Sequence, residues 1–155
     1  GVTSPPGRPC WLGRPPTTLR PMLSPTLDTL RVFLHVLAAA VWVGGQITLL
    51  VLLPTVRTLG DDAPRRMARA FNPAAWFAFG VLLVTGMWNL LEVDVGSTSV
   101  AYQATLGLKL IVVALSGFGA FVHTTTSDRR LLAISGVVGG VTALLALFLG
   151  VLLIY

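Results

Sequence analysis

The chain has 155 residues, of which 54% are hydrophobic and only 11% are charged, and its mean hydropathy is +0.81. These values exclude an ordinary soluble domain and predict a polytopic membrane protein. The formal charge of +5 would suggest nucleic-acid binding in a soluble protein, but nine of the eleven basic residues lie in the arm or the loops, where lipid headgroups and orientation explain them. Of the other two, Arg31 stands at the entrance of the first apolar segment and Lys109 lies inside the third. We therefore expect no nucleic-acid partner. The single cysteine, Cys10, excludes an internal disulfide and a multi-cysteine metal site.

Residues 1–27 contain seven of the ten prolines and three arginines, and they show no helical periodicity. This composition predicts a disordered arm, because it offers no apolar face that could pack. It also lacks the apolar core of a signal peptide. One interpretation is that the natural start is Met22 and the arm is an artefact; the alternative is a genuine tail that meets a partner. We expect a chain that begins at Met22 to insert and to bind any cofactor as the full chain does.

Four apolar segments follow the arm, and each approaches or exceeds the roughly 20 residues that cross a hydrocarbon core of about 30 Å. They span about residues 27–53, 74–91, 103–122 and 131–154. Thr26 or Asp28 can cap the first. Residues 28–155 are therefore predicted to form one all-α domain, a four-helix transmembrane bundle in the lipid bilayer.

The connections predict the orientation of this bundle. The loops 54–73 and 123–130 hold Arg57, Arg65, Arg66, Arg69, Arg129 and Arg130, whereas the loop after the second segment holds no basic residue. The positive-inside rule places both arginine-rich loops in the cytoplasm and both termini outside an inner (plasma) membrane. Within the first loop, Asp61, Asp62 and Pro64 precede RRMARAF, which predicts either a short interfacial amphipathic helix or a solvated loop.

Polar side chains mark one face of the first segment and one face of the third. His35, Trp42 and Gln46 fall within roughly 40° of one another on a helix. In the third segment, Lys109, Ser116, Ala120 and His123 also share one face. Histidine and lysine are costly inside a membrane and indicate function by default, generally facing the interior of a bundle.

Depth decides which of these residues share a site. His35 and Lys109 lie about seven and six residues inside two segments that run in the same direction, so they are expected to converge in the outer half of the bundle. Trp42 and Gln46 are expected below them, and His123 about 21 Å away along the axis. His35 is the candidate metal ligand, as a neutral imidazole. The alternative is that His35 only hydrogen-bonds a neighbouring helix while Lys109 reaches the headgroups.

Two other patterns leave alternatives open. Thr85, Asn89 and Glu92 share a face of the second segment, where they either extend the polar site or mark the helix end. Gly136 and Gly140 form a GxxxG pair, which lets helices approach closely inside one chain or in a homo-oligomer or membrane complex. HExxH, CxxC and Walker motifs are missing from the sequence, so hydrolytic and phosphoryl chemistry have no support. A methionine-rich ladder of soft ligands for copper is also missing.

The sequences LHVLAAAVWVGGQ, VLLVTGMWNLL and LGLKLIVVALSG, with Thr98 and Tyr102 before the last, resemble the membrane domain of the copper resistance protein D (CopD) family. The resemblance covers about residues 28–153. The family pattern corresponds here to His35, Trp42, Gly44 and Gly45, then Thr85 and Gly86, then Tyr102 and Lys109. It implies copper uptake or resistance, and hence a protein that binds or transports copper or haem.

The same layout is similar to the HemJ-type protoporphyrinogen oxidases, four-helix membrane proteins that bind haem b. This chain has LLPTVRTLG where that family places a histidine after its first helix. The resemblance implies a haem-containing membrane oxidoreductase as the alternative function. A structural accessory subunit of a membrane complex is the third reading. Under the first two, the cofactor is copper or haem b, held by His35, Lys109, Trp42 and Gln46.

Overall fold

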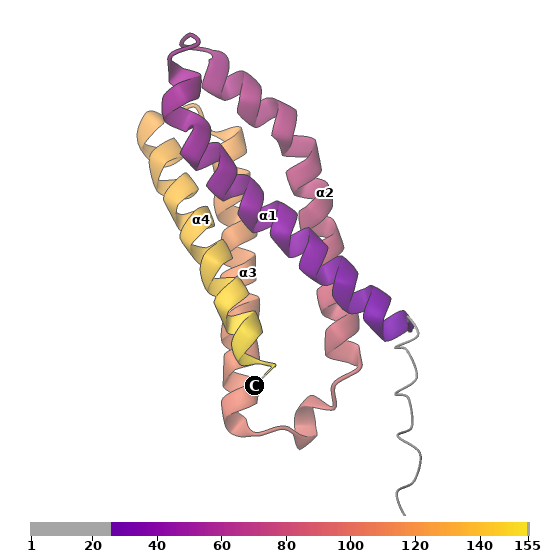
Figure 1. Ribbon diagram of the computed structural model, residues 1–155. Helices are drawn as coiled ribbons and strands as arrows, with labels where there is room; N and C mark the ends of the chain where they lie inside the picture. The colour runs from indigo at the N-terminus through magenta and orange to yellow at the C-terminus, as the bar shows by residue number, and fades with distance from the viewer. Residues whose placement is uncertain (1–25, 155) are drawn as a thin grey trace, which may run out of the picture.

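The computed structural model describes residues 26–154, and within them it is an all-α bundle of four long helices (Figure 1). The helices are α1 (Leu27–Arg57), α2 (Ala63–Leu91), α3 (Val100–Thr125) and α4 (Arg129–Leu152), with a short 3₁₀ helix, η2 (Val95–Ser97), before α3. All four are long and apolar enough to cross a membrane. Successive helices run in opposite directions, so α1 and α3 run in the same general direction, although α1 crosses α3 obliquely. The predicted fold class is confirmed.

The helix boundaries correct one part of the sequence interpretation. Most of the predicted loop 54–73 is helical: α1 continues through Pro54 to Arg57, and α2 begins at Ala63 and continues through Pro73. RRMARAF is therefore neither a separate interfacial helix nor a solvated loop, but the first turns of α2. A proline leaves only one backbone carbonyl unpaired within a helix, and carbonyls close to the headgroups can bind water instead.

Side-chain caps fix where three of the helices begin. Thr26 accepts a hydrogen bond from the Thr29 amide at 3.2 Å, which decides between the two predicted caps of α1. Ser99 caps α3 in the same way, and Asp128 accepts from two amides at the start of α4. Each cap satisfies backbone N–H groups that have no partner within the helix.

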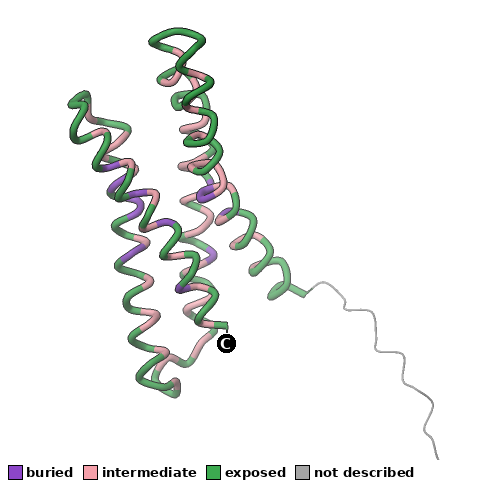
Figure 2. Tube along the Cα trace, turned by 60° about the vertical axis from the view of Figure 1, so that its left-hand side comes forward, coloured by how far each residue is buried: buried purple, intermediate pink, exposed green. Residues whose placement is uncertain are grey.

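The bundle consists of two hairpins, α1–α2 and α3–α4, that meet mainly through α1 and α4. The hairpins lie close together near the middle of the helices and separate toward the N-terminal end of α1 (Figures 1 and 2). Inside the second hairpin the backbones touch, because a β-carbon placed on Gly119 would lie 2.9 Å from the amide nitrogen of Gly139. Inside the first, the Phe71 ring occupies the space beside Gly45, so glycine allows α2 to pack closely on α1.

The buried core lies where the hairpins meet (Figure 2). Trp42, Val43 and Ala143 form it, and Phe79 packs on the Trp42 ring with centroids 4.6 Å apart. Most large apolar side chains point outward; Phe77, for example, is 76% exposed. An outer surface of this kind fits the hydrocarbon of a bilayer.

The predicted arm, including Met22 and Cys10, lies outside the described residues except at its last two positions. The interpretations of Met22 as the natural start and of the arm as dispensable therefore stay predictions.

Candidate functional site

His35 contacts α2, the neighbouring helix of its own hairpin. Its Nδ1 atom lies 2.8 Å from the Thr85 hydroxyl oxygen, in a half-buried hydrogen bond. The ring also rests against Gly86, where a β-carbon would lie 3.4 Å from the imidazole Cε1. The histidine of the first helix and the Thr-Gly pair of the second, both parts of the CopD-like pattern, are thus in contact.

The hydrogen bonds of Thr85 determine the tautomer of His35. The Thr85 hydroxyl has one proton, which it donates to the Val81 carbonyl at 2.6 Å. The same oxygen must therefore accept from His35, so that Nδ1 carries the imidazole proton. In a neutral ring this leaves the lone pair on Nε2, which has no hydrogen-bond partner among the described residues. A histidine held at Nδ1 with Nε2 free is the usual state of a metal-ligating imidazole.

Trp42 lies in a chain of hydrogen bonds that joins α1, α3 and α4. We call the three residues of this chain, Trp42, Ser116 and Gly139, the seam. The indole N–H of Trp42 donates to the Ser116 hydroxyl at 3.2 Å, and that hydroxyl donates to the Gly139 carbonyl at 3.2 Å. All of these groups are buried and paired. The seam is therefore a structural element and leaves no free group for a ligand.

The seam also establishes the register of the two parallel helices. His35 precedes Trp42 by seven residues, and Lys109 precedes Ser116 by seven residues. Both side chains consequently lie about 10 Å from the seam, on the same side of it. That the two residues lie at equal depth stays a prediction.

The lateral positions of the two residues differ. His35 faces Gly86 of α2, whereas Lys109 faces Gly150 of α4, where a β-carbon would lie 3.1 Å from Nζ. No hydrogen bond joins the two side chains. Lys109 is half-buried and has no ion-pair partner among residues 26–154. The two residues thus belong to opposite hairpins at one level.

The other polar residues that the sequence singled out lie further along the bundle. Gln46 packs against Gly140 of α4, one turn beyond the seam, and His123 packs against Gly136 near the opposite end. His123 Nδ1 also donates to the Leu132 carbonyl at 2.8 Å. The structure therefore brings Trp42 and Gln46 below His35, as predicted, and keeps His123 away. Both glycines of the GxxxG pair face side chains of their own chain.

Arg31 is a residue that the sequence interpretation had assigned only to a helix entrance. Its side chain is 11% exposed and forms ion pairs with Asp28, at 3.3 Å, and with Glu92 of α2, at 3.5 Å. It also lies over the Trp88 ring, 5.9 Å from the centroid. Nε and Nη1 nevertheless lack a hydrogen-bond partner in the described chain. Arg31 precedes His35 by one helical turn and therefore lies on the same face of α1.

Glu92 contacts both Arg31 and the Trp88 indole, which donates to it at 3.2 Å. Glu92 follows the last residue of α2 and is exposed, so it both ends the helix and contacts the buried guanidinium. Asn89 is half-buried on the same helix. No hydrogen bond from its side chain is found among the described residues.

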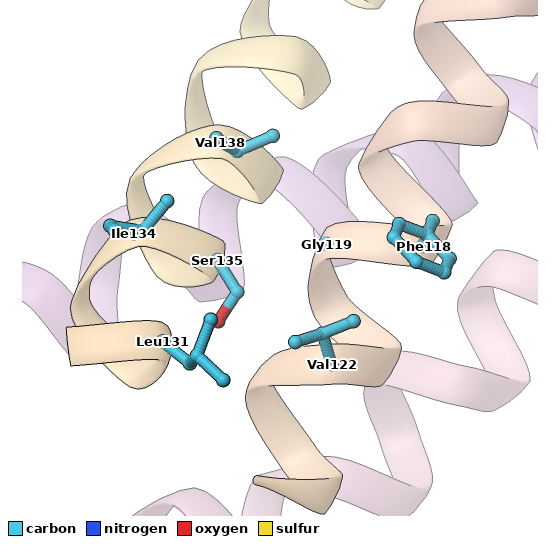
Figure 3. Close-up of a pocket in the computed structure, with 7 residues that line it drawn as sticks. All are labelled: Phe118, Gly119, Val122, Leu131, Ile134, Ser135 and Val138. Atoms are coloured by element: carbon cyan, nitrogen blue, oxygen red, sulfur yellow. The ribbon is translucent and has the colours of Figure 1, made fainter. Parts of the chain in front are cut away.

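Two hollows in the described structure do not include His35 in their linings. A groove of about 480 Å³ between α1 and α2 includes Thr85 and Trp88 in its wall, together with exposed residues such as Phe77 and Val84. A second hollow, of about 180 Å³, lies between α3 and α4 (Figure 3). Its lining is apolar apart from Ser135, whose hydroxyl donates to the Leu132 carbonyl. Both hollows open to the outside of the bundle.

The described residues contain no group of three or more histidine, cysteine, aspartate or glutamate side chains that could hold a metal ion. His35 is thus the only metal-ligating imidazole at its level in this part of the chain. A metal bound there would need further ligands from another molecule, from Lys109, or from a macrocycle that already supplies most of the donors.

The partners of three residues do not follow from the sequence alone. Thr85 belongs to the CopD-like pattern and to a face with Asn89 and Glu92, Ser116 to a polar face, and Arg31 to a helix entrance, but their contacts appear only in the structure. The common spacing of seven residues between His35 and Trp42 and between Lys109 and Ser116 was a usable signal for Ser116. The partners of Thr85 and Arg31 depend on how α2 is rotated against α1, which periodicity does not give.

Comparison of the chain with protein-family models, with curated proteins and with solved structures found no match. The resemblance to the CopD and HemJ-type families therefore stays a prediction that rests on the motifs.

Proposed function

We propose that this chain is a CopD-like integral membrane protein that binds haem b, with the His35 imidazole as an axial ligand of the iron. The observation that carries the proposal is the hydrogen bond from His35 Nδ1 to Thr85, because it leaves the Nε2 lone pair free. The porphyrin would supply four nitrogen donors, so that one or two protein ligands suffice. This fits a site with a single imidazole.

The charges near His35 favour haem over copper. Lys109 has no acidic partner among the described residues, whereas Arg31 is paired with Asp28 and Glu92. A copper ion would be repelled by an uncompensated ammonium group, whereas a carboxylate would be attracted to it. Haem propionates are such carboxylates. Lys109 would hold a propionate as a cation, or would be the second axial ligand if burial removes its proton.

Copper binding or transport is the second candidate, supported by the CopD-like motifs. It requires ligands beyond His35, because Cu(I) prefers soft donors and residues 26–154 contain no cysteine. A haem-dependent oxidoreductase of the HemJ type would use the same haem site. An accessory subunit would need neither cofactor.

One experiment separates these candidates. The full chain is purified in detergent from cells supplied with haem precursor and copper, and its absorption spectrum and metal content are measured. A Soret band with about one iron per chain is expected. Copper without a Soret band would support the second candidate, and absence of both would support an accessory role. Turnover of protoporphyrinogen by the haem-loaded protein would identify the oxidoreductase.

We also propose a plasma-membrane location with both termini outside, because six arginines lie at the end of the bundle formed by the α1–α2 and α3–α4 connections. His35 and Lys109 then lie in the outer half. A topology reporter fused after Tyr155 should be active outside the cytoplasm. Cytoplasmic activity would show that the orientation is the reverse.

Association of copies through Gly136 and Gly140 stays a prediction, and cross-linking in the membrane would test it.

A further inference from the structure

The first turns of α2 carry a cluster of arginines that has no acidic partner. Arg65, Arg66 and Arg69 are exposed, and none of them forms an ion pair with a described residue. Arg57, at the end of α1, and Arg129 and Arg130, at the start of α4, lie at the same end of the bundle (Figure 1). Three aspartates accompany these six arginines, and the carboxylate of Asp128 is already engaged in capping α4.

The length of α2 places this cluster at the level of lipid headgroups. A helix of 29 residues is about 43 Å long, whereas the hydrocarbon core is about 30 Å thick. With the Trp88 end of α2 at one interface, about nine residues at the other end extend beyond the hydrocarbon. These residues include Arg65, Arg66 and Arg69.

The extension is held in a fixed orientation. Phe71 packs into the space beside Gly45 of α1, which pins this part of α2 to its neighbour. On a helical projection the three arginines lie about 120° or more from Phe71, so they point away from α1. Guanidinium groups at headgroup depth can donate hydrogen bonds to the phosphate oxygens of lipids.

We propose that Arg65, Arg66 and Arg69 form a binding site for the phosphate groups of anionic phospholipids. The site is independent of His35 and of any haem. It would enrich acidic lipids around the α1–α2 connection.

The test uses the full chain in nanodiscs of phosphatidylcholine with a minor fraction of phosphatidylglycerol, and native mass spectrometry of the lipids that remain bound. Each arginine is expected to contribute about a fivefold preference at low salt. The R65Q/R66Q/R69Q variant should therefore lose the preference for phosphatidylglycerol by about 100-fold. The R65K/R66K/R69K variant is the matched control, and it should keep most of the preference because it keeps the charge.

Two results would overturn the proposal. One is unchanged phosphatidylglycerol retention in R65Q/R66Q/R69Q, with helicity equal to that of the wild type by circular dichroism. The other is displacement of the bound phosphatidylglycerol by millimolar inorganic phosphate, which would identify a site for free phosphate instead of lipid. Wild-type retention that falls with salt, while inorganic phosphate has no specific effect, is the expected outcome.

Discussion

Two levels of the bundle, about 10 Å apart along the helices, differ in whether their polar groups have hydrogen-bond partners. At the seam, the groups of Trp42, Ser116 and Gly139 satisfy one another and are buried. At the level of His35 and Lys109, the imidazole Nε2 and the ammonium group have no partner among residues 26–154. Buried polar groups in membranes are costly unless they are paired. The difference indicates that the seam serves the fold, and it supports the proposal that a ligand binds at the level of His35 and Lys109.

The largest effect on folding should come from the glycine contact that supports the seam. A β-carbon on Gly119 would lie 2.9 Å from the Gly139 backbone, whereas one on Gly107, in the same helix, would meet nothing within 4 Å. Gly119→Ala should therefore lower the free energy of unfolding by up to about 3 kcal/mol, through overpacking. Gly107→Ala should leave it unchanged or raise it slightly, because alanine favours helix. Denaturation in mixed micelles compares the two; equal stabilities would refute the close contact.

Thr85→Val keeps the shape of the side chain but removes the acceptor for His35. Because partners of this kind fix the orientation and tautomer of a ligating imidazole, haem affinity should fall by about 10-fold to 100-fold. Haem titration measures the change. Thr85→Ser restores a hydroxyl and should recover most of the affinity. If valine and threonine bind haem equally well, the hydrogen bond does not prepare His35 for a ligand.

Two variants of Lys109 distinguish whether its side chain holds a propionate or ligates iron. Lys109→Met should weaken haem binding by about tenfold, the loss of one charged hydrogen bond. Lys109→Arg should keep the affinity if the residue holds a propionate, and should change the spectrum if the amine ligates iron. Wild-type affinity and spectrum in both variants would mean that Lys109 only reaches the headgroups.

The smallest expected effect is the coupling free energy between two residues of the seam. A double-mutant cycle with Trp42→Phe and Ser116→Ala should give a coupling free energy of about 0.6 kcal/mol, and at most about 1.7 kcal/mol, as is typical within membranes. Haem affinity should not change, because the seam leaves no group for the ligand. If these substitutions altered haem binding but not stability, the seam would contribute to the ligand site and not to the fold.

The sequence was sufficient for features that depend on periodicity and length. Four apolar segments gave the fold class, and the spacings of His35, Trp42, Lys109 and Ser116 gave faces and depths. It was not sufficient for the continuity of α2 through Pro73, because proline usually indicates a break. Nor could it show that Gly86 and Gly150 accommodate His35 and Lys109, since lateral helix packing depends on contacts between segments far apart in the chain.

The most direct test of the account compares the only two histidines of the chain. His35 and His123 each donate a hydrogen bond through Nδ1, to Thr85 and to Leu132, but only His35 lies at the level that lacks partners. The wild type, His35→Ala and His123→Ala are purified after membrane insertion has been verified, and haem per chain is measured from the Soret band. We expect haem in the wild type and in His123→Ala, and none in His35→Ala. Undiminished haem in His35→Ala would contradict the proposal that His35 ligates haem.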